Sequence, residues 1–402
     1  MFINEDTMTD ITDLSTIARE QQHTSGAYYK RPLTLVRGQG VTVWDDAGHA
    51  YLDATSGQGV VLLGHAHPVV TQAIQRQAET LVTCTEIFYN DQRANLYATL
   101  SRILPAELGR VFLCNSGAEA IEGALKVARL LTGRTGLVAA KRGFHGRTLG
   151  ALGLTWNKDY REPFAGWTPP NITHVTYHDF EAIDAAITDQ TAAVLLEPVQ
   201  GEGGVYPADA AWIQHVRRLC DERGALLIMD EIQTGLGRTG RWFGFQHSDI
   251  LPDIIALGKG LAGGVPMGAV IWRSSLGTIP AGTHGTTFGG NPLASAAAVA
   301  TLETLENEHL PENAAHIGTW LMDQLRAAQD QMPLVREVRG LGLIIGLELR
   351  QRVTPILQAL QEQHGILALP AGQTVLRLLP PLILNETEAE RLLQGVIAAL
   401  KS

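Results

Sequence analysis

The amino-acid sequence predicts an α/β fold with more than one domain. Apolar strand-like runs alternate with amphipathic helical segments between about residues 70 and 295, which is the pattern of strands connected by helices. The chain has 402 residues, enough to bury a large core and to form a second domain. We therefore expect a large α/β domain over residues 70–295.

The two ends of the chain predict a smaller domain. Residues 33–54 predict two strands around an Asp-Asp-Ala-Gly turn. From about residue 300 the pattern predicts a helix, the strand pair VREVRGLGLIIGLEL, another helix and a strand over Val375–Leu379. We expect residues 1–69 and 296–402 to form this α+β domain together.

Composition argues against several classes of partner. The 31 Lys and Arg residues face 41 Asp and Glu residues, for a net charge of −10, and no basic block stands out, so nucleic acid is not an expected partner. No apolar run is long enough to cross a membrane, and the first residues are acidic and polar, unlike a signal peptide. We therefore expect a cytoplasmic protein that does not bind membranes.

Cysteine and histidine spacing gives no sign of a metal site. The cysteines are Cys84, Cys114 and Cys220, an odd and widely spaced set without a CxxC pattern. His65 and His67 in GHAHP have no carboxylate or further histidine at useful spacing. We expect no bound metal.

Lys259 and Asp230 have the chemistry that pyridoxal phosphate requires. Lys259 stands among small and apolar neighbours in LGKGLAGG, which favours a neutral amine able to form a Schiff base with an aldehyde. Asp230 ends the apolar run Ala225–Met229, a predicted buried strand, and its carboxylate can hold a proton on a pyridine nitrogen. Taken singly, a solvated loop lysine and a helix-capping aspartate remain alternatives. A Walker loop is excluded, because Asp253 and Gly260 stand where it needs glycine and Ser or Thr.

A separate segment predicts a phosphate cradle. The strand-like run Val111–Leu113 leads through Asn115–Ala118 into an amphipathic helix. Small residues at a helix N-terminus let backbone N–H groups approach a phosphate, and the helix dipole adds positive potential there. The alternative is an ordinary helix capped by Ser116, with Glu119 completing a capping box.

Six segments in order resemble the class-III pyridoxal phosphate aminotransferases. They are NSGAEA, GFHGRT, LLEPVQGEGG, MDEIQTGLGRTG, LGKGLAGGVPMGA and TTFGGNPLA. The resemblance runs from about Lys30 to Leu382 and is greatest to the acetylornithine and acyl-lysine (ornithine) aminotransferases. It implies a fold-type I pyridoxal phosphate transferase, with a large mixed-sheet α/β cofactor domain and a small α+β domain formed from both chain ends.

The resemblance also implies the residues that hold the cofactor. Lys259 would carry it as a Schiff base, Asp230 would face the pyridine nitrogen, and Thr287 would reach the phosphate held by the other subunit of a homodimer with shared sites. The remaining cofactor contacts that the resemblance implies are Ser116, Gly117, Ala118, Phe144 and Gln233. An aromatic face such as that of Phe144 suits a flat heterocycle, although such a residue can equally fill the core. We expect His145 to be a structural histidine.

Two arginines are the expected substrate anchors. Arg147 offers a planar fork for a carboxylate, and Arg377 lies in an apolar strand where an unpaired charge would be costly. We expect Glu197 to be the partner of Arg377, and the resemblance implies that this glutamate opens when a dicarboxylate arrives. The alternative is a static salt bridge. Thr286 is expected near the substrate, and Gln58 departs from the aromatic or apolar residue of the relatives.

The resemblance implies an aminotransferase that moves the terminal amino group of an N-acylated basic amino acid to 2-oxoglutarate, giving the semialdehyde and glutamate, in arginine or lysine biosynthesis. N2-acetylornithine is the first expectation. Alternatives are an acyl-lysine, an amine on an acidic amino-group carrier protein, or another omega-amine. A pyridoxal phosphate mutase or racemase would share the fold and the lysine, whereas a binding protein without turnover would not need both arginines and a glutamate.

Overall fold

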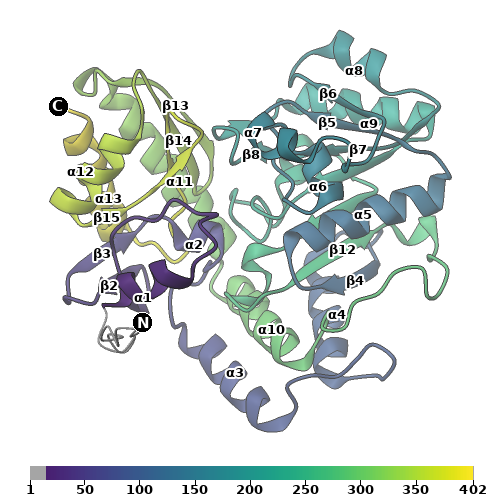
Figure 1. Ribbon diagram of the computed structural model, residues 1–402, viewed down its shortest axis with the longest axis horizontal. Coiled ribbons are helices and arrows are strands. Elements are labelled where there is room, and N and C mark those ends of the chain that lie inside the picture. The colour runs from purple at the N-terminus through teal and green to yellow at the C-terminus, as the bar shows by residue number, and fades with distance from the viewer. Residues whose placement is uncertain (1–14, 402) are drawn as a thin grey trace, which may run out of the picture.

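The computed structural model describes residues 15–401 as two domains that lie side by side (Figure 1). The larger domain is built around a sheet with the strand order β4-β12-β11-β10-β7-β5-β6. Its strands are β4 (Arg110–Cys114), β12 (Gly268–Trp272), β11 (Ile254–Leu257), β10 (Leu226–Asp230), β7 (Thr191–Leu196), β5 (Gly136–Ala140) and β6 (Ile172–Val175). Strand β12 is antiparallel to both of its neighbours and the other pairs are parallel, so the sheet is mixed, as expected.

Helices cover both faces of this sheet. Alternate residues of one strand point to opposite faces, so Ile228 of β10 packs with α5 (Gly117–Thr132), whereas Leu227 and Met229 pack in the cluster that contains α9 (Ala210–Arg223). Every residue of β7, β10, β11 and β12 is buried, which explains their continuous apolar sequences. The other large-domain helices are α3 (Pro68–Thr80), α4 (Asp91–Ile103), α6 (Leu149–Leu154), α7 (Lys158–Arg161), α8 (Phe180–Ala186) and α10 (Pro292–Asn307).

The smaller domain contains both ends of the described chain, which confirms its composite nature. Strand β15 (Ile366–Leu367) adds in parallel to β3 (Ala50–Asp53), in the sheet order β1-β2-β3-β15. A second sheet has the order β13-β14-β17-β16, from β13 (Val335–Leu341), β14 (Ile344–Leu349), β17 (Val375–Leu378) and β16 (Leu369–Ala371). Its helices are α1 (Thr16–His23), α2 (Ser56–Gly59), α11 (Leu310–Ala327), α12 (Thr354–His364) and α13 (Glu386–Leu400). The boundaries at 69/70 and 295/296 stay predictions.

The N-terminal strands differ from the prediction in number. Where two strands were expected over residues 33–54, the structure has three: β1 (Leu35–Gln39), β2 (Thr42–Asp45) and β3. The extra turn falls at Gly40, whose φ of +55° reverses the chain so that β1 pairs antiparallel with β2. The second turn, before β3, is the expected one, and Asp45 caps it by accepting from the His49 N–H at 2.8 Å.

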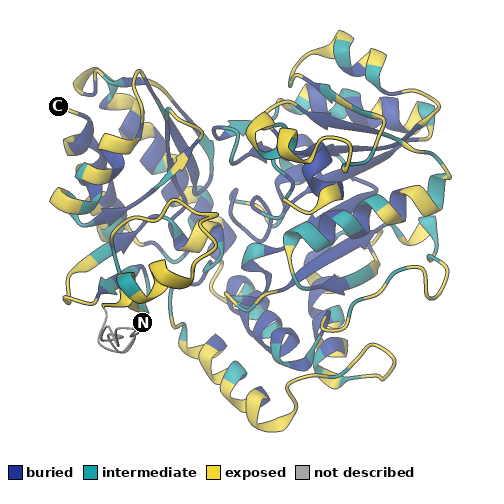
Figure 2. Ribbon diagram, in the orientation of Figure 1, coloured by how far each residue is buried: buried dark blue, intermediate teal, exposed yellow. Residues whose placement is uncertain are grey.

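Burial follows the layers (Figure 2). The strands of the large sheet are buried, whereas the outer faces of α3 and α13 are exposed (Figure 2). Among residues 15–401, no helix combines the length and apolar character needed to cross a membrane. In the same part of the chain, no group of three or more His, Cys, Asp or Glu side chains is placed to hold a metal ion.

Candidate active site

The predicted site residues gather at the carboxyl edge of the parallel strands. Asp230 is the last residue of β10, Glu197 follows β7, and Lys259 follows β11 after Gly258. Strands β7, β10 and β11 are adjacent and parallel, so their carboxyl ends meet at one edge. Open α/β sheets bind ligands at this edge, where loops diverge outside the strand ends.

Lys259 begins a short 3-10 helix, Lys259–Ala262, with a backbone φ of +42°. The pKa of Lys259 is lowered to about 8, mainly by burial and also by the positive charge of Arg377, while Glu202, Asp230 and Glu197 act in the opposite direction. A substantial fraction of this amine is therefore neutral near neutral to mildly basic pH, as a nucleophilic or proton-transferring lysine requires.

Asp230 is paired with His145. The His145 Nδ1 and the Asp230 Oδ2 are 2.8 Å apart, and the Ile232 N–H donates to the other carboxylate oxygen at 3.1 Å. Both side chains are buried, at 2% exposure for His145 and 4% for Asp230. His145 therefore lies against a predicted site residue, and its structural role stays a prediction. The position directly after Phe144, a predicted site residue, was the only sequence signal for this pairing.

The start of α5 has the geometry expected of a phosphate cradle, and the role of Ser116, Gly117 and Ala118 stays a prediction. Ser116 caps the helix by accepting from the Glu119 N–H at 3.2 Å, while the Glu119 carboxylate accepts from the Asn115 N–H at 2.6 Å. Backbone packs closely here, because a Cβ on Gly258 would lie 3.0 Å from the Gly117 Cα. Both the cap and the close approach are present, so the cap does not exclude a phosphate site. The N–H groups at this helix start, near Gly117 and Ala118, are suited to an anion.

The partner of Arg377 is Glu202, which corrects the predicted pairing with Glu197. The Arg377 Nη2 lies 2.7 Å from the Glu202 Oε1, and its Nη1 donates to the Gln233 Oε1 at 3.4 Å. The Glu197 oxygens accept instead from the backbone N–H groups of Phe144, at 2.9 Å, and Gly201, at 3.1 Å. Among the described residues, Arg377 forms its salt bridge with Glu202 and none with Glu197, so Glu202 is the carboxylate that neutralises it.

The surface around Arg147 and Phe144 is open and aromatic. Arg147 is exposed and its guanidinium stacks over the Tyr160 ring at 4.1 Å, while Phe144 meets the same ring edge-on at 6.3 Å. A cavity of about 410 Å³ lies beside these residues. Its lining includes Arg142, Phe144, Trp156, Lys158, Tyr160 and Glu202.

The remaining predicted residues are Thr286 and Thr287, in a loop, and Gln58, in the short helix α2. The Thr286 hydroxyl accepts from the Asn115 side chain at 3.0 Å, so it lies next to the start of α5. Thr287 is exposed, and so is Gln58, whose φ of +68° departs from helical geometry. The adjacent Gly59 lies close to the Gln233 side chain. The roles of these three residues stay predictions.

Comparison with known proteins gives the family. The protein-family model named aminotransferase class-III matches residues 24–400 of the chain. The chain belongs to the class-III aminotransferases. It is 48% identical, over 96% of this chain and 89% of the relative, to the [LysW]-aminoadipate semialdehyde transaminase of Deinococcus radiodurans. It is 45% identical, over 93% of this chain and 96% of the relative, to the acetylornithine aminotransferase of Methanopyrus kandleri.

Solved structures agree with this assignment. The ornithine aminotransferase of Toxoplasma gondii matches with a TM-score of 0.91 at 33% identity, covering 97% of this chain and 96% of that chain. The acetylornithine aminotransferase of Elizabethkingia anophelis matches with a TM-score of 0.84 at 31% identity, covering 96% and 97%. The cofactor of this class-III aminotransferase is pyridoxal phosphate, which another crystal of the Toxoplasma gondii enzyme holds in part at its active site.

The site of this aminotransferase fits that cofactor. Two buried polar atoms, the Gln233 Nε2 and the His145 Nε2, have no hydrogen-bond partner among the described residues. Buried polar groups are normally satisfied, so such atoms on the neighbours of Asp230 and Arg377 point to a polar group that binds there. The cradle at Gly117 offers backbone N–H groups for its phosphate.

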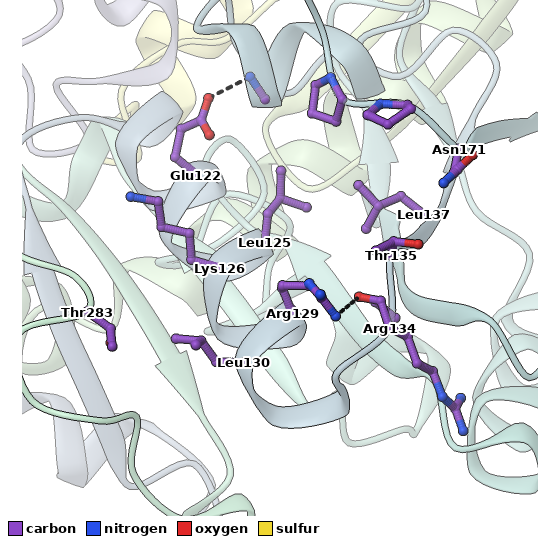
Figure 3. A pocket seen from close by; sticks show the side chains of 14 residues that line it. Glu122, Leu125, Lys126, Arg129, Leu130, Arg134, Thr135, Leu137, Asn171 and Thr283 are labelled. Atoms are coloured by element: carbon purple, nitrogen blue, oxygen red, sulfur yellow. Dashed lines mark hydrogen bonds between the residues drawn. The ribbon is translucent and has the colours of Figure 1, made fainter.

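A second pocket of the aminotransferase lies away from this chemistry (Figure 3). It has a volume of about 490 Å³ and follows the C-terminal half of α5, where Leu125, Lys126 and Arg129 line it. Glu122 at its edge accepts from the Gly150 N–H at 2.8 Å. None of the predicted site residues lines this pocket.

Proposed function

We propose that this aminotransferase moves the terminal amino group of an N-acylated basic amino acid, first N2-acetylornithine, to 2-oxoglutarate, giving the semialdehyde and glutamate. The main support for the proposal is the Arg377–Glu202 pair near Lys259. Arg377 can bind a substrate carboxylate, and the Glu202 side chain can neutralise it when the substrate has no carboxylate to place there. Named relatives that act on acetylornithine and on aminoadipate semialdehyde support a role in arginine or lysine biosynthesis.

Three residues of the chain serve the chemical steps. When bound, pyridoxal phosphate supplies an aldehyde that takes up and returns the amino group, and a ring that withdraws electrons from the neighbouring carbon. Lys259 would hold the cofactor at rest, and its free amine would take the proton from the substrate carbon that bears the amine and return it to the cofactor carbon that carried the aldehyde. Asp230, oriented by His145, keeps a proton on the ring nitrogen.

The two arginines bind the two substrates differently. A terminal-amine donor places its far amine at the cofactor, so its carboxylate reaches Arg147 while Glu202 neutralises Arg377. 2-Oxoglutarate reacts at its α-carbon, so its α-carboxylate takes Arg377 after Glu202 moves aside, and its distal carboxylate takes Arg147. A bidentate arginine–carboxylate pair gives both affinity and orientation. One site can therefore alternate between the two substrates.

An amine displayed on an acidic carrier protein is the second candidate. The relative at 48% identity is named as acting on [LysW]-aminoadipate semialdehyde. The cavity beside Phe144 and Tyr160 is also lined by Arg142 and Lys158. These cations suit an acidic partner, although the whole chain has a net charge of −10. Gln58 is exposed and stands where the aminotransferases that the sequence resembles have an aromatic or apolar residue. Its polar side chain suits a substrate with a polar tail.

A panel of amine donors tests the proposal. The enzyme would be mixed, without an acceptor, with one amine at a time. The amines are N2-acetylornithine, an acyl-lysine whose terminal amine is free, free ornithine and a lysine displayed on a carrier protein. The conversion of bound cofactor to pyridoxamine phosphate would be followed by absorbance. The proposal predicts the fastest conversion with acetylornithine and reversal by 2-oxoglutarate. Conversion only with the carrier-bound amine would select the second candidate. Turnover of an amine substrate without this spectral endpoint would indicate a mutase or racemase.

We propose further that the enzyme is a homodimer with shared sites. Thr287 is exposed and lies beside the exposed Phe288, at 59% exposure. The loop before α4 exposes Ile87 at 80%, Phe88 at 63% and Tyr89 at 106%. Apolar side chains gathered in this way are typical of protein interfaces, and a two-fold dimer would cover both copies of the surface.

A further inference from the structure

We propose that Glu197 is a positioning residue that joins the loop carrying Phe144 to the loop carrying Glu202. It would thereby link the aromatic cover of the cofactor to the acid that competes for Arg377. The inference deepens the proposed function and rests on it for the role of Glu202.

The geometry of Glu197 gives one oxygen to each loop. Its Oε1 accepts from the Phe144 N–H at 2.9 Å, and its Oε2 accepts from the Gly201 N–H at 3.1 Å. The residue is 6% exposed, so water does not compete for these bonds. Hydrogen bonds to a carboxylate are stronger than those between neutral groups. Phe144 and Glu202 are each fixed, directly or through Gly201, by the same side chain.

Glu197 is itself held from behind. The Tyr177 hydroxyl accepts from the Glu197 N–H at 3.1 Å and donates to the Glu197 carbonyl at 2.6 Å. The Tyr177 ring packs against Trp212 of α9, with ring centroids 4.9 Å apart. Tyr177 therefore anchors the backbone at the end of β7 to α9, and the Glu197 carboxylate extends from this anchored backbone toward the Phe144 and Gly201 loops.

The two loops also touch, so they cannot move independently. A Cβ on Gly203 would lie 2.3 Å from the Arg142 carbonyl oxygen, a distance that only glycine avoids. Gly143, just before Phe144, lies close to the Glu197 Oε1. A shift of the loop around Gly201 would be transmitted to the backbone before Phe144 by both this packing and the shared carboxylate.

Glu231 offers a matched control. It is 1% exposed and, like Glu197, accepts hydrogen bonds from two backbone N–H groups. The donors are Gly244, at 2.9 Å, and Phe245, at 2.8 Å. Burial raises the pKa of both carboxyls to about 7. Glu231 also accepts from the Thr234 hydroxyl. The segment at Gly244 and Phe245 contains none of the predicted site residues, so replacing Glu231 removes a buried anchor without releasing Phe144 or Glu202.

The experiment compares Glu197→Gln, Glu197→Asp and Glu231→Gln with the wild type. The Gln amide can accept only one of the two N–H groups, and the Asp carboxylate is one methylene too short to reach both. One reading is the affinity of the apoprotein for added pyridoxal phosphate, followed by protein fluorescence. The other is the ratio of single-turnover rates with glutamate and with the best amine donor. Each Glu197 variant should weaken cofactor binding about ten-fold and raise the ratio of glutamate to amine.

The expected control result is a lower thermal midpoint for Glu231→Gln with both readings at their wild-type values. Wild-type affinity and ratio in Glu197→Gln would overturn the proposal, and so would equal changes in Glu231→Gln. If the Glu197 variants do not fold, Tyr177→Phe, which removes the bonds to the Glu197 backbone, should shift both readings in the same direction and less far; no shift would overturn it. A wild type inactive with every amine would refute the proposed function instead, and cofactor affinity would still test the linkage to Phe144.

Discussion

The ion pair between Arg377 and Glu202 is unequally exposed. The nitrogen and oxygen are 2.7 Å apart, yet the Arg377 side chain is 2% exposed and that of Glu202 is 36% exposed. A fully buried charge without a partner is costly, so Arg377 must always face a carboxylate. Glu202 can turn into solvent at smaller cost. This asymmetry allows a substrate carboxylate to replace Glu202.

Replacing Glu202 with alanine should favour glutamate. The buried Arg377 would then have no competing partner until a substrate α-carboxylate arrives. Removing one member of such a pair is worth on the order of 2 to 5 kcal/mol, so the ratio of glutamate to amine single-turnover rates should rise by about 30-fold or more. The control is Asp221→Ala, which removes an exposed partner of Arg217 within α9 and should leave the ratio unchanged. An unchanged ratio in Glu202→Ala would contradict the exchange of carboxylates.

Lys259 should carry the cofactor. Borohydride reduction followed by peptide mapping should place the pyridoxyl group on Lys259, because its amine is buried beside Asp230 and its pKa is lowered. Lys259→Ala should still bind cofactor through the cradle and Asp230 but show no turnover. Label on another lysine, or activity of the variant without added amine, would refute this role.

The pH dependence of the rate at which cofactor attaches to Lys259 should reflect the lowered pKa of this lysine. With a pKa of about 8, roughly half of these amines are neutral at pH 8, against ~0.3% for a lysine of ordinary pKa. The neutral amine is the reactive form, so the rate at which apoprotein takes up cofactor should rise with pH and level off a little above pH 8. Stopped-flow absorbance measures this rate. A rate that keeps rising ten-fold per pH unit to pH 10 would show an ordinary lysine.

Mixed dimers should test the shared site. A heterodimer of a Lys259→Ala chain and a Thr287→Ala chain contains one site with both native residues, if Thr287 serves the neighbouring subunit. Activity at limiting cofactor should therefore exceed that of either parent homodimer. Verified heterodimers without this recovery would show that each chain supplies its own Thr287.

The sequence predicts the parts of the site that are local. Lys259 and Asp230 each follow a continuous apolar strand, so their position at the strand ends can be inferred without the fold. The cradle is likewise contained within Asn115–Ala118, a turn and a helix start. The mixed sheet order is not local, since the antiparallel β12 between β4 and β11 depends on long-range pairing.

The partners of buried charges are the parts that could not be predicted. Glu197 and Glu202 lie five positions apart in LLEPVQGEGG, and only the path of the turn at Gly201 decides which one reaches Arg377. His145 pairs with Asp230 from 85 positions away in the chain, and no local pattern reveals that contact. Side-chain pairing across loops depends on tertiary geometry that propensity and periodicity do not contain.

The division of work between Arg147 and Arg377 can be measured in the variant Arg377→Ala. The two half-reactions would be measured separately as single turnovers, with glutamate and with the best terminal-amine donor. Arg377→Ala should lose about 30-fold or more in rate with glutamate and much less with the amine, whereas Arg147→Ala should impair both. Equal losses in the two half-reactions of Arg377→Ala would instead show that Arg377 has a structural role only.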